Sequence, residues 1–239
     1  MKIKEIIKRI IYGAKANSNT YVNSLRKKGM RIGENCTIYV PTKTSIDETR
    51  PWMIQIGDNV EITEGVTILT HGYEWSVFKQ LYGDIMGSCG QVFIGNNCFI
   101  GMNTTILKDV IIGENCIIGA NSVVTAGCYP DNSLIVGAPA KVVGNVNDYY
   151  EKRKKAQLKE ALCLFENYTK SFSSVLPKEV FREFFWLFEN REGKLIEPFN
   201  KTFMLGGGFE KSKKRFLETK PMFNSYEEFV DYCERQERQ

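Results

Sequence analysis

The chain has 239 residues, of which 43% are hydrophobic and 25% are charged, a composition typical of an ordinary soluble protein. Its net charge of +4 is too small to indicate a nucleic-acid-binding protein, so we expect no nucleic-acid partner. Seven cysteines without a CxxC pair lack the pattern of a disulfide-rich secreted protein, which predicts reduced thiols and a cytoplasmic location.

Residues 1–31 are a basic arm, with nine Lys or Arg and a single acidic residue. Isoleucines recur at helical spacing among these cations, which predicts an amphipathic helix: Ile3, Ile6, Ile7, Ile10 and Ile11. The arm lacks the uninterrupted apolar run of a signal peptide or a membrane span. Packing against its own protein is the favoured role for this helix, and weak contact with an anionic membrane surface stays open.

From residue 32 onward, a branched aliphatic residue returns every sixth position, usually followed by Gly. The longest run in one phase is Ile94, Ile100, Ile106, Ile112, Ile118 and Val124, continued after a break at Pro130 by Val136 and Val142. Earlier members of the repeat are Ile32, Ile38, Ile56, Ile62 and Ile68. This period fits neither an α-helix nor a two-sided strand, but it fits a short strand followed by a corner. Three such units close one triangular coil, and stacked coils form a solenoid.

A second position of the repeat, four residues after the aliphatic one, also carries small or medium side chains that we expect to face inward. It is occupied by Cys36, Val60, Val66, Cys98, Thr104, Val110, Cys116, Ser122, Cys128 and Ala140. Gly-x-Asn recurs between the two positions, and both residue types tolerate the positive φ of a tight corner. The four cysteines of this set are therefore predicted to be core residues, not nucleophiles or ligands.

The phase breaks between Ile68 and Ile94, where a glycine-rich and aromatic loop, residues 71–91, leaves the repeat. The loop opens on His71, the only histidine of the chain. Loops on a rigid scaffold commonly carry function, and an imidazole can take up and return a proton near neutral pH. His71 is therefore the candidate general base, with a histidine that only caps a corner of the coil as the alternative.

Three segments resemble the hexapeptide-repeat acyltransferases, a family that includes galactoside, maltose, serine and xenobiotic acetyltransferases: ITEGVTILTHGYEWSV, FIGMNTTILKDVIIGENCIIGANSVVTAG and VGAPAKVVG. The likeness is greatest to the O-acetyltransferases of capsular and surface polysaccharide synthesis, and it covers roughly residues 20–146. It implies a mainly β fold, a left-handed parallel β-helix, assembled as a homotrimer. It also implies acetyl-CoA as co-substrate in the groove between neighbouring subunits, with no metal required.

The resemblance also implies roles for individual residues. His71 matches the catalytic base, while Met102, Ala120, Thr125 and Lys141 match positions that hold the pantetheine and phosphates of CoA. A solvated surface lysine is an equal interpretation of Lys141.

Two departures from the family pattern concern the candidate site. Ala126 stands where many relatives have a basic residue, which puts one phosphate contact in doubt. Gly72 stands where many polysaccharide acetyltransferases have Asp, and Glu74 or Asp47 is the candidate replacement that orients the imidazole or holds the acceptor.

The aromatic residues that follow the histidine are candidates for a wall that stacks on a sugar or covers pantetheine. These residues are Tyr73, Trp75 and Phe78. Burial at the root of the loop or in the trimer seam is an equal interpretation.

Past Asn147 the repeat ends, and twelve of the fifteen phenylalanines follow it. Helices are predicted over 149–170, from Pro177 onward and over 225–235, with a break at 206–208. The second of these carries phenylalanines on one helical face: Phe181, Phe184, Phe185 and Phe188. The predicted organisation is an N-terminal helical arm (1–31), a β-helix (32–146) with loop 71–91, and an α-helical extension (147–239).

The expected function is transfer of an acetyl group from acetyl-CoA to a hydroxyl of a sugar or surface-glycan precursor, by direct attack without an acyl-enzyme. Three alternatives stay open. One is a xenobiotic (antibiotic) acetyltransferase, because the segment HGYEW also resembles those enzymes, and another is a sugar N-acetyltransferase. The third is a non-catalytic trimeric scaffold, which Gly72 and Ala126 favour. A zinc carbonic anhydrase of the same fold is excluded, because it needs three histidines.

Overall fold

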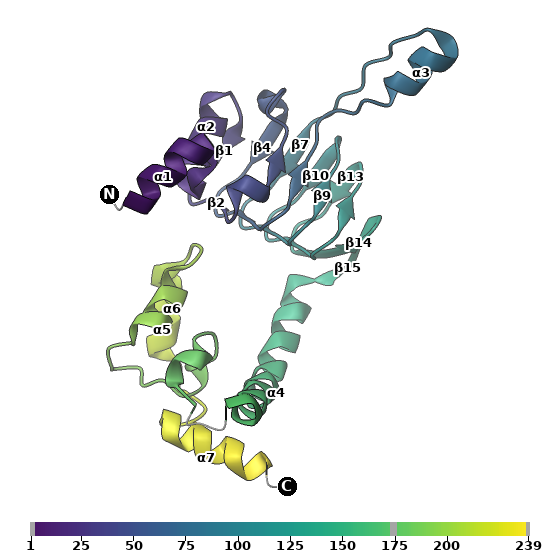
Figure 1. Cartoon of the computed structure of the whole chain (residues 1–239). Coiled ribbons are helices and arrows are strands. Elements are labelled where there is room, and N and C mark those ends of the chain that lie inside the picture. Colours follow the sequence, from purple (N-terminus) through teal and green to yellow (C-terminus); the bar gives the residue numbers. More distant parts are fainter. Residues whose placement is uncertain (1–2, 173–175, 238–239) are drawn as a thin grey trace. The chain divides into compact units, whose positions relative to one another are not determined.

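A computed structural model describes residues 3–172 and 176–237 of the chain. The chain divides into two compact units, Met1–Tyr149 and Tyr150–Gln239, each with its own hydrophobic core (Figure 1). Among the described residues, none of the helices has the length and apolar character needed to cross a membrane.

The N-terminal arm consists of α1 (Ile3–Tyr12), a 3-10 helix η1 (Gly13–Ala16) and α2 (Ser18–Lys27). Asn17 caps α2, since its side chain accepts a hydrogen bond from the amide of Thr20 at 3.0 Å. Three side chains of α2 are buried in the core of the first unit: Tyr21, Val22 and Leu25. The isoleucines of α1 from Ile6 onward are instead exposed, so within the first unit this helix does not pack its apolar face as the favoured prediction had it.

From residue 3 onward, the first unit contains fifteen short strands in three sheets. One sheet contains β1 (Arg31–Ile32), β4 (Ile54–Ile56), β7 (Val92–Ile94), β10 (Val110–Ile112) and β13 (Gly127–Tyr129). The second contains β2 (Thr37–Ile38), β5 (Glu61–Ile62), β8 (Phe99–Ile100), β11 (Ile117–Ile118), β14 (Ser133–Gly137) and β15 (Ala140–Asn145). The third contains β3 (Ser45–Ile46), β6 (Thr67–Ile68), β9 (Thr105–Ile106) and β12 (Val123–Val124).

The chain visits the three sheets in turn, so successive strands of one sheet come from successive coils. All strand pairs are parallel except β14 with β15, which form an antiparallel pair at the end of the solenoid. The predicted parallel β-helix is therefore confirmed as a three-sided solenoid. The first coil is longer than the coils that follow the loop, because the 3-10 helices η2 (Pro41–Lys43) and η3 (Pro51–Met53) flank β3.

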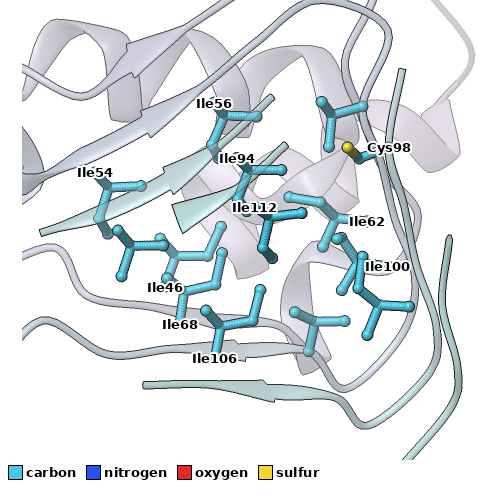
Figure 2. Packing of buried hydrophobic residues seen from close by; sticks show 14 of the residues in the cluster. Ile46, Ile54, Ile56, Ile62, Ile68, Ile94, Cys98, Ile100, Ile106 and Ile112 are labelled. Carbon is cyan, nitrogen blue, oxygen red and sulfur yellow. The ribbon is translucent and has the colours of Figure 1, made fainter. Parts of the chain in front are cut away.

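The six-residue repeat produces ladders of isoleucine inside the solenoid. Figure 2 shows Ile56, Ile94 and Ile112 pointing inward from consecutive strands, and the other two sheets contribute equivalent rows. The corners form as the Gly-x-Asn motif predicts, since Asn97 and Asn115 have φ of 55° and 57°. Their side chains also join the coils, because the Asn97 amide donates to the Asn115 side-chain oxygen at 2.8 Å.

The register shifts by one residue near the end of the repeat. Tyr129, not Pro130, pairs with Ile112, and Ile135 pairs with Ile118 and is fully buried. Because this coil is one residue short, Cys128 pairs with the outward-facing Ile111 and is exposed.

The prediction that Cys128, Val136 and Val142 lie in the core is therefore wrong. Val142 is exposed and Val136 only half-buried. The buried places predicted for Cys98 and Cys116 are confirmed, whereas Cys36 is half-buried.

The loop leaves the solenoid between β6 and β7 and carries an unpredicted helix, α3 (Trp75–Tyr82), at the end of an extended arm (Figure 1). The two ends of the loop meet at its base, where His71 and Cys89 form an isolated antiparallel bridge. The amide of Gly90 also donates to the carbonyl of Thr70 at 2.9 Å. The solenoid therefore continues past the loop in register.

The second unit is helical, and α4 (Val146–Phe172) leads into it from the first. Its other elements are η4 (Lys178–Phe181), η5 (Phe185–Leu187), α5 (Glu197–Met204), α6 (Phe209–Glu218) and α7 (Tyr226–Glu237). The predicted helices over 149–170 and 225–235 are thus confirmed. The single helix predicted from Pro177 is wrong, because two short 3-10 helices replace it.

The segment that carries the phenylalanine stripe does not form one helix, because its rings pack against different helices of the unit. Phe185 stacks on Phe199 of α5 with ring centroids 4.9 Å apart, while Phe188 stacks on Phe229 of α7 at 5.1 Å. Tertiary packing of large aromatic side chains therefore overrides a helical pattern of only two turns.

Candidate active site

His71 lies at the corner between the third and first sheets, just after β6 and at the start of the loop. Its side chain is 13% exposed. The Tyr73 ring meets the imidazole edge-on, with ring centroids 5.2 Å apart. The histidine is therefore positioned by the solenoid corner that carries it and by the Tyr73 ring of the loop.

Asp47 occupies the equivalent corner one coil earlier, just after β3, and its amide donates to the carbonyl of Ile68 at 2.9 Å. This stacking brings the Asp47 carboxylate next to the histidine, with Oδ2 2.7 Å from His71 Nδ1. The Asp47 side chain is only 3% exposed. Of the two acidic residues that the sequence offered as partners of the imidazole, Asp47 makes the contact.

Several donors hold the Asp47 carboxylate in place. The amide and hydroxyl of Thr49 donate to Oδ1 at 2.9 and 2.6 Å, and the Thr70 hydroxyl donates to Oδ2. Burial raises the pKa of this carboxyl group, but the hydrogen bonds from Thr49, Thr70 and His71 outweigh burial and leave its pKa well below the usual value. Asp47 is therefore ionised at neutral pH.

The ionised carboxylate determines which nitrogen of His71 carries the proton. A carboxylate can only accept hydrogen bonds, so Nδ1 must be the protonated nitrogen of the neutral ring. Nε2 is then left with a free lone pair. An imidazole that is oriented in this way on its far side is suited to act as a general base.

Glu74 takes a different position from Asp47: its carboxylate lies beside Gly72, whereas the hydrogen bond to His71 Nδ1 comes from Asp47. A Cβ built on Gly72 would be 2.0 Å from Glu74 Oε2, so the glutamate occupies space that a larger residue at position 72 would need.

A pocket of about 240 Å³ opens beside His71. It is lined by Thr49, Arg50, His71, Gly72, Tyr73, Trp75, Gly87 and Ser88. Of the three aromatic residues predicted to form a wall, Tyr73 and Trp75 line this pocket, whereas Phe78 is not among its lining residues.

Four of the residues that line this pocket were not predicted as site residues from the sequence: Thr49, Arg50, Gly87 and Ser88. Thr49 follows Asp47 in a local turn that an Asp-x-Thr pattern signals. Arg50, which donates to the carbonyl of Ser88 at 3.3 Å, carried no such signal, and neither did Ser88.

The residues matched to CoA contacts lie at different places on the solenoid. Met102 and Ala120 share a corner between the second and third sheets, where the amide of Asn121 donates to the Met102 carbonyl at 2.8 Å. Thr125 follows β12 and so lies on the same corner as His71, two coils further on. Lys141 is exposed on β15.

Within the part of the chain that the structure describes, no group of three or more His, Cys, Asp or Glu side chains is arranged to hold a metal ion.

Residues 91–126 match the family model described as bacterial transferase hexapeptide (six repeats). The resemblance of the repeats to the hexapeptide-repeat transferases is therefore confirmed over this segment. It covers β7 through β12 of the solenoid.

Among characterised proteins, Protein CapG from Staphylococcus aureus is 41% identical over 93 residues, which are 38% of this chain and 52% of CapG. The chain thus spans about half the length of this relative. Two solved structures are also similar. The hexapeptide-repeat acetyltransferase VCA0836 from Vibrio cholerae, complexed with acetyl-CoA, has 26% identity and a TM-score of 0.43 over 50% of this chain and 61% of its own. A maltose O-acetyltransferase from Clostridium difficile 630 has 27% identity and a TM-score of 0.39 over 54% and 75%.

Proposed function

We propose that the chain is an acetyltransferase that moves an acetyl group from acetyl-CoA to a hydroxyl of a sugar or surface-glycan precursor. The hydrogen bond between the Asp47 carboxylate and His71 Nδ1 carries this proposal, because it leaves Nε2 free to accept a proton beside an open pocket. The match of residues 91–126 to bacterial transferase repeats supports the reaction class.

In the proposed reaction, the acceptor hydroxyl donates its proton to His71 Nε2 while its oxygen attacks the thioester carbonyl carbon. The tetrahedral intermediate collapses with loss of the CoA sulfur, which takes up the proton from the imidazolium. The acetyl ester and free CoA are the products. Attack is direct, and no cysteine is among the residues that line the described pocket.

Asp47 has two roles in this proposal. It holds the imidazole in the tautomer that presents Nε2, and its negative charge stabilises the imidazolium that forms during the transfer. Tyr73, Trp75 and Arg50 line the proposed acceptor pocket. Glu74 is a candidate acceptor contact.

The binding of acetyl-CoA is proposed on the resemblance of this sequence to the acyltransferases. Met102, Ala120, Thr125 and Lys141 are the proposed contacts for pantetheine and phosphate. We also propose a left-handed β-helix, a homotrimer with the CoA groove between subunits, and a cytoplasmic location. We further propose that the chain has three parts: an arm (1–31), a β-helix (32–146) and an extension (147–239).

The test is release of CoA thiol from acetyl-CoA in the presence of sugars, nucleotide sugars, amino sugars and chloramphenicol-like alcohols. We expect acceptor-dependent release by the wild type. In His71→Ala we expect release to fall at least ~100-fold while acetyl-CoA binding is retained, as for the loss of a positioned base. Lys79→Ala, a change at an exposed position of α3, is the matched control and should leave the rate unchanged.

The outcomes separate the alternatives. Near-normal turnover in His71→Ala would refute the role of His71, and a preference for amino sugars or for antibiotic-like alcohols would change the acceptor class. Absence of both thiol release and acetyl-CoA binding in the wild type would favour a non-catalytic scaffold.

A further inference from the structure

The helix α1 has an apolar stripe that the first unit leaves uncovered. Ile6, Ile7, Ile10 and Ile11 are 41%, 49%, 78% and 64% exposed. Spacings of three and four residues place these side chains together on one side of the helix. The next helix, α2, buries its own apolar residues in the core, so the uncovered stripe is confined to α1.

Positive charge accompanies the stripe. Lys8 and Arg9 of α1 are exposed. At 100° per residue, they flank the apolar stripe, one on each side of it. Residues 1–31 contain nine basic residues and one acidic residue, whereas the net charge of the whole chain is only +4. Apolar and cationic surfaces therefore lie next to each other along one short helix.

We propose that α1 lies in the plane of an anionic membrane surface. In this arrangement the isoleucines enter the boundary between headgroups and acyl chains, and the Lys and Arg side chains contact lipid phosphates. With ten residues, α1 is too short to span a bilayer, which fits binding in the interface. The proposal concerns the arm alone and does not depend on the activity of the His71 site.

The positive charge of the arm favours an anionic lipid surface over a second copy of α1 as the partner of the stripe. Two α1 helices packed through their isoleucines would bring together two strongly basic arms, whose like charges repel. An anionic lipid surface covers the same apolar stripe and neutralises those charges at the same time. Binding through one short helix should be reversible, and high salt should weaken it by screening the charges.

The experiment is cosedimentation of the full chain with vesicles of phosphatidylcholine alone and of phosphatidylcholine with a quarter phosphatidylglycerol. We expect at least tenfold tighter binding to the anionic vesicles, lost at high salt. Ile10→Glu should weaken this binding at least tenfold, and Lys8→Gln combined with Arg9→Gln should weaken it severalfold.

Ile85→Glu, at another exposed isoleucine, which lies in the loop, is the matched control and should bind like the wild type. Circular dichroism and light scattering of each variant report folding and oligomeric state. The proposal is overturned by equal binding to both vesicle types, by no binding, or by unchanged binding of Ile10→Glu. A change of oligomeric state in Ile10→Glu without wild-type lipid binding would instead assign the stripe to a second copy.

Discussion

At the scale of residues, the candidate site depends on two side chains that are 24 positions apart in sequence. His71 could be identified from the sequence, because it is the only histidine and it begins the loop. Asp47 could be named only as one of two candidates, since nothing in the sequence aligns it with the histidine. The stacking of consecutive coils places the two at one corner, and this decides between Asp47 and Glu74.

Replacing Asp47 by asparagine tests this pairing. The side-chain amide of Asn can donate to Nδ1, which favours the tautomer with the proton on Nε2, so we expect kcat to fall at least about tenfold. The dissociation constant of acetyl-CoA, measured by calorimetry, should change little. Glu74→Gln is the comparison: loss of a candidate acceptor contact should raise the KM of the acceptor but keep kcat within about twofold. A larger loss of kcat in Glu74→Gln than in Asp47→Asn would make Glu74 the orienting residue.

At the scale of elements, the corners of the solenoid explain why the repeat needs glycine. A Cβ on Gly101 would lie 2.5 Å from the amide nitrogen of Ala120 in the next coil and 2.7 Å from the carbonyl oxygen of Ile118. Both contacts are to backbone, which cannot move without separating the strands of adjacent coils. The glycine here permits close approach of two coils, and its φ is not in the left-handed region.

Gly101→Ala should therefore destabilise the β-helix. We expect the free energy of unfolding in urea to fall by about 1–3 kcal/mol, as for overpacking of a closely packed interior. Gly144→Ala is the control, because a Cβ there would have no atom within 4 Å. Equal stability of the two variants would show that the coils can separate at low cost.

At the scale of the whole molecule, the chain contains two hydrophobic cores of different chemistry. The core of the first unit consists mainly of isoleucine and valine in ladders, and that of the second mainly of phenylalanine rings. Phe181 is fully buried in the second core, with the Phe229 ring centroid 5.0 Å away. Separate cores predict that the two units lose their structure in separate steps.

Phe181→Ala should affect only one of these steps. We expect the unfolding free energy of the second unit to fall by about 3–5 kcal/mol. Differential scanning calorimetry of the full chain should show one transition shifted to lower temperature and the other unchanged. Leu205→Ala, at an exposed position of the same unit, should shift neither. A single transition that moves as a whole would contradict independent unfolding.

The repeat alone determined the solenoid, because a six-residue period with Gly and Asn at fixed places is compatible with few structures. The break in the repeat identified His71, and local sequence patterns identified the long helix over 149–170 and the short helix over 225–235. It could not show where the period slips, since Val136 and Ile135 are equally apolar and only pairing with Ile118 decides which is buried. Nor could it predict the 3-10 helices around Phe185, because contacts with distant rings decide their shape. The partner of His71 likewise emerges only when the coils stack, since Asp47, Thr49 and Thr70 meet across two turns of the solenoid.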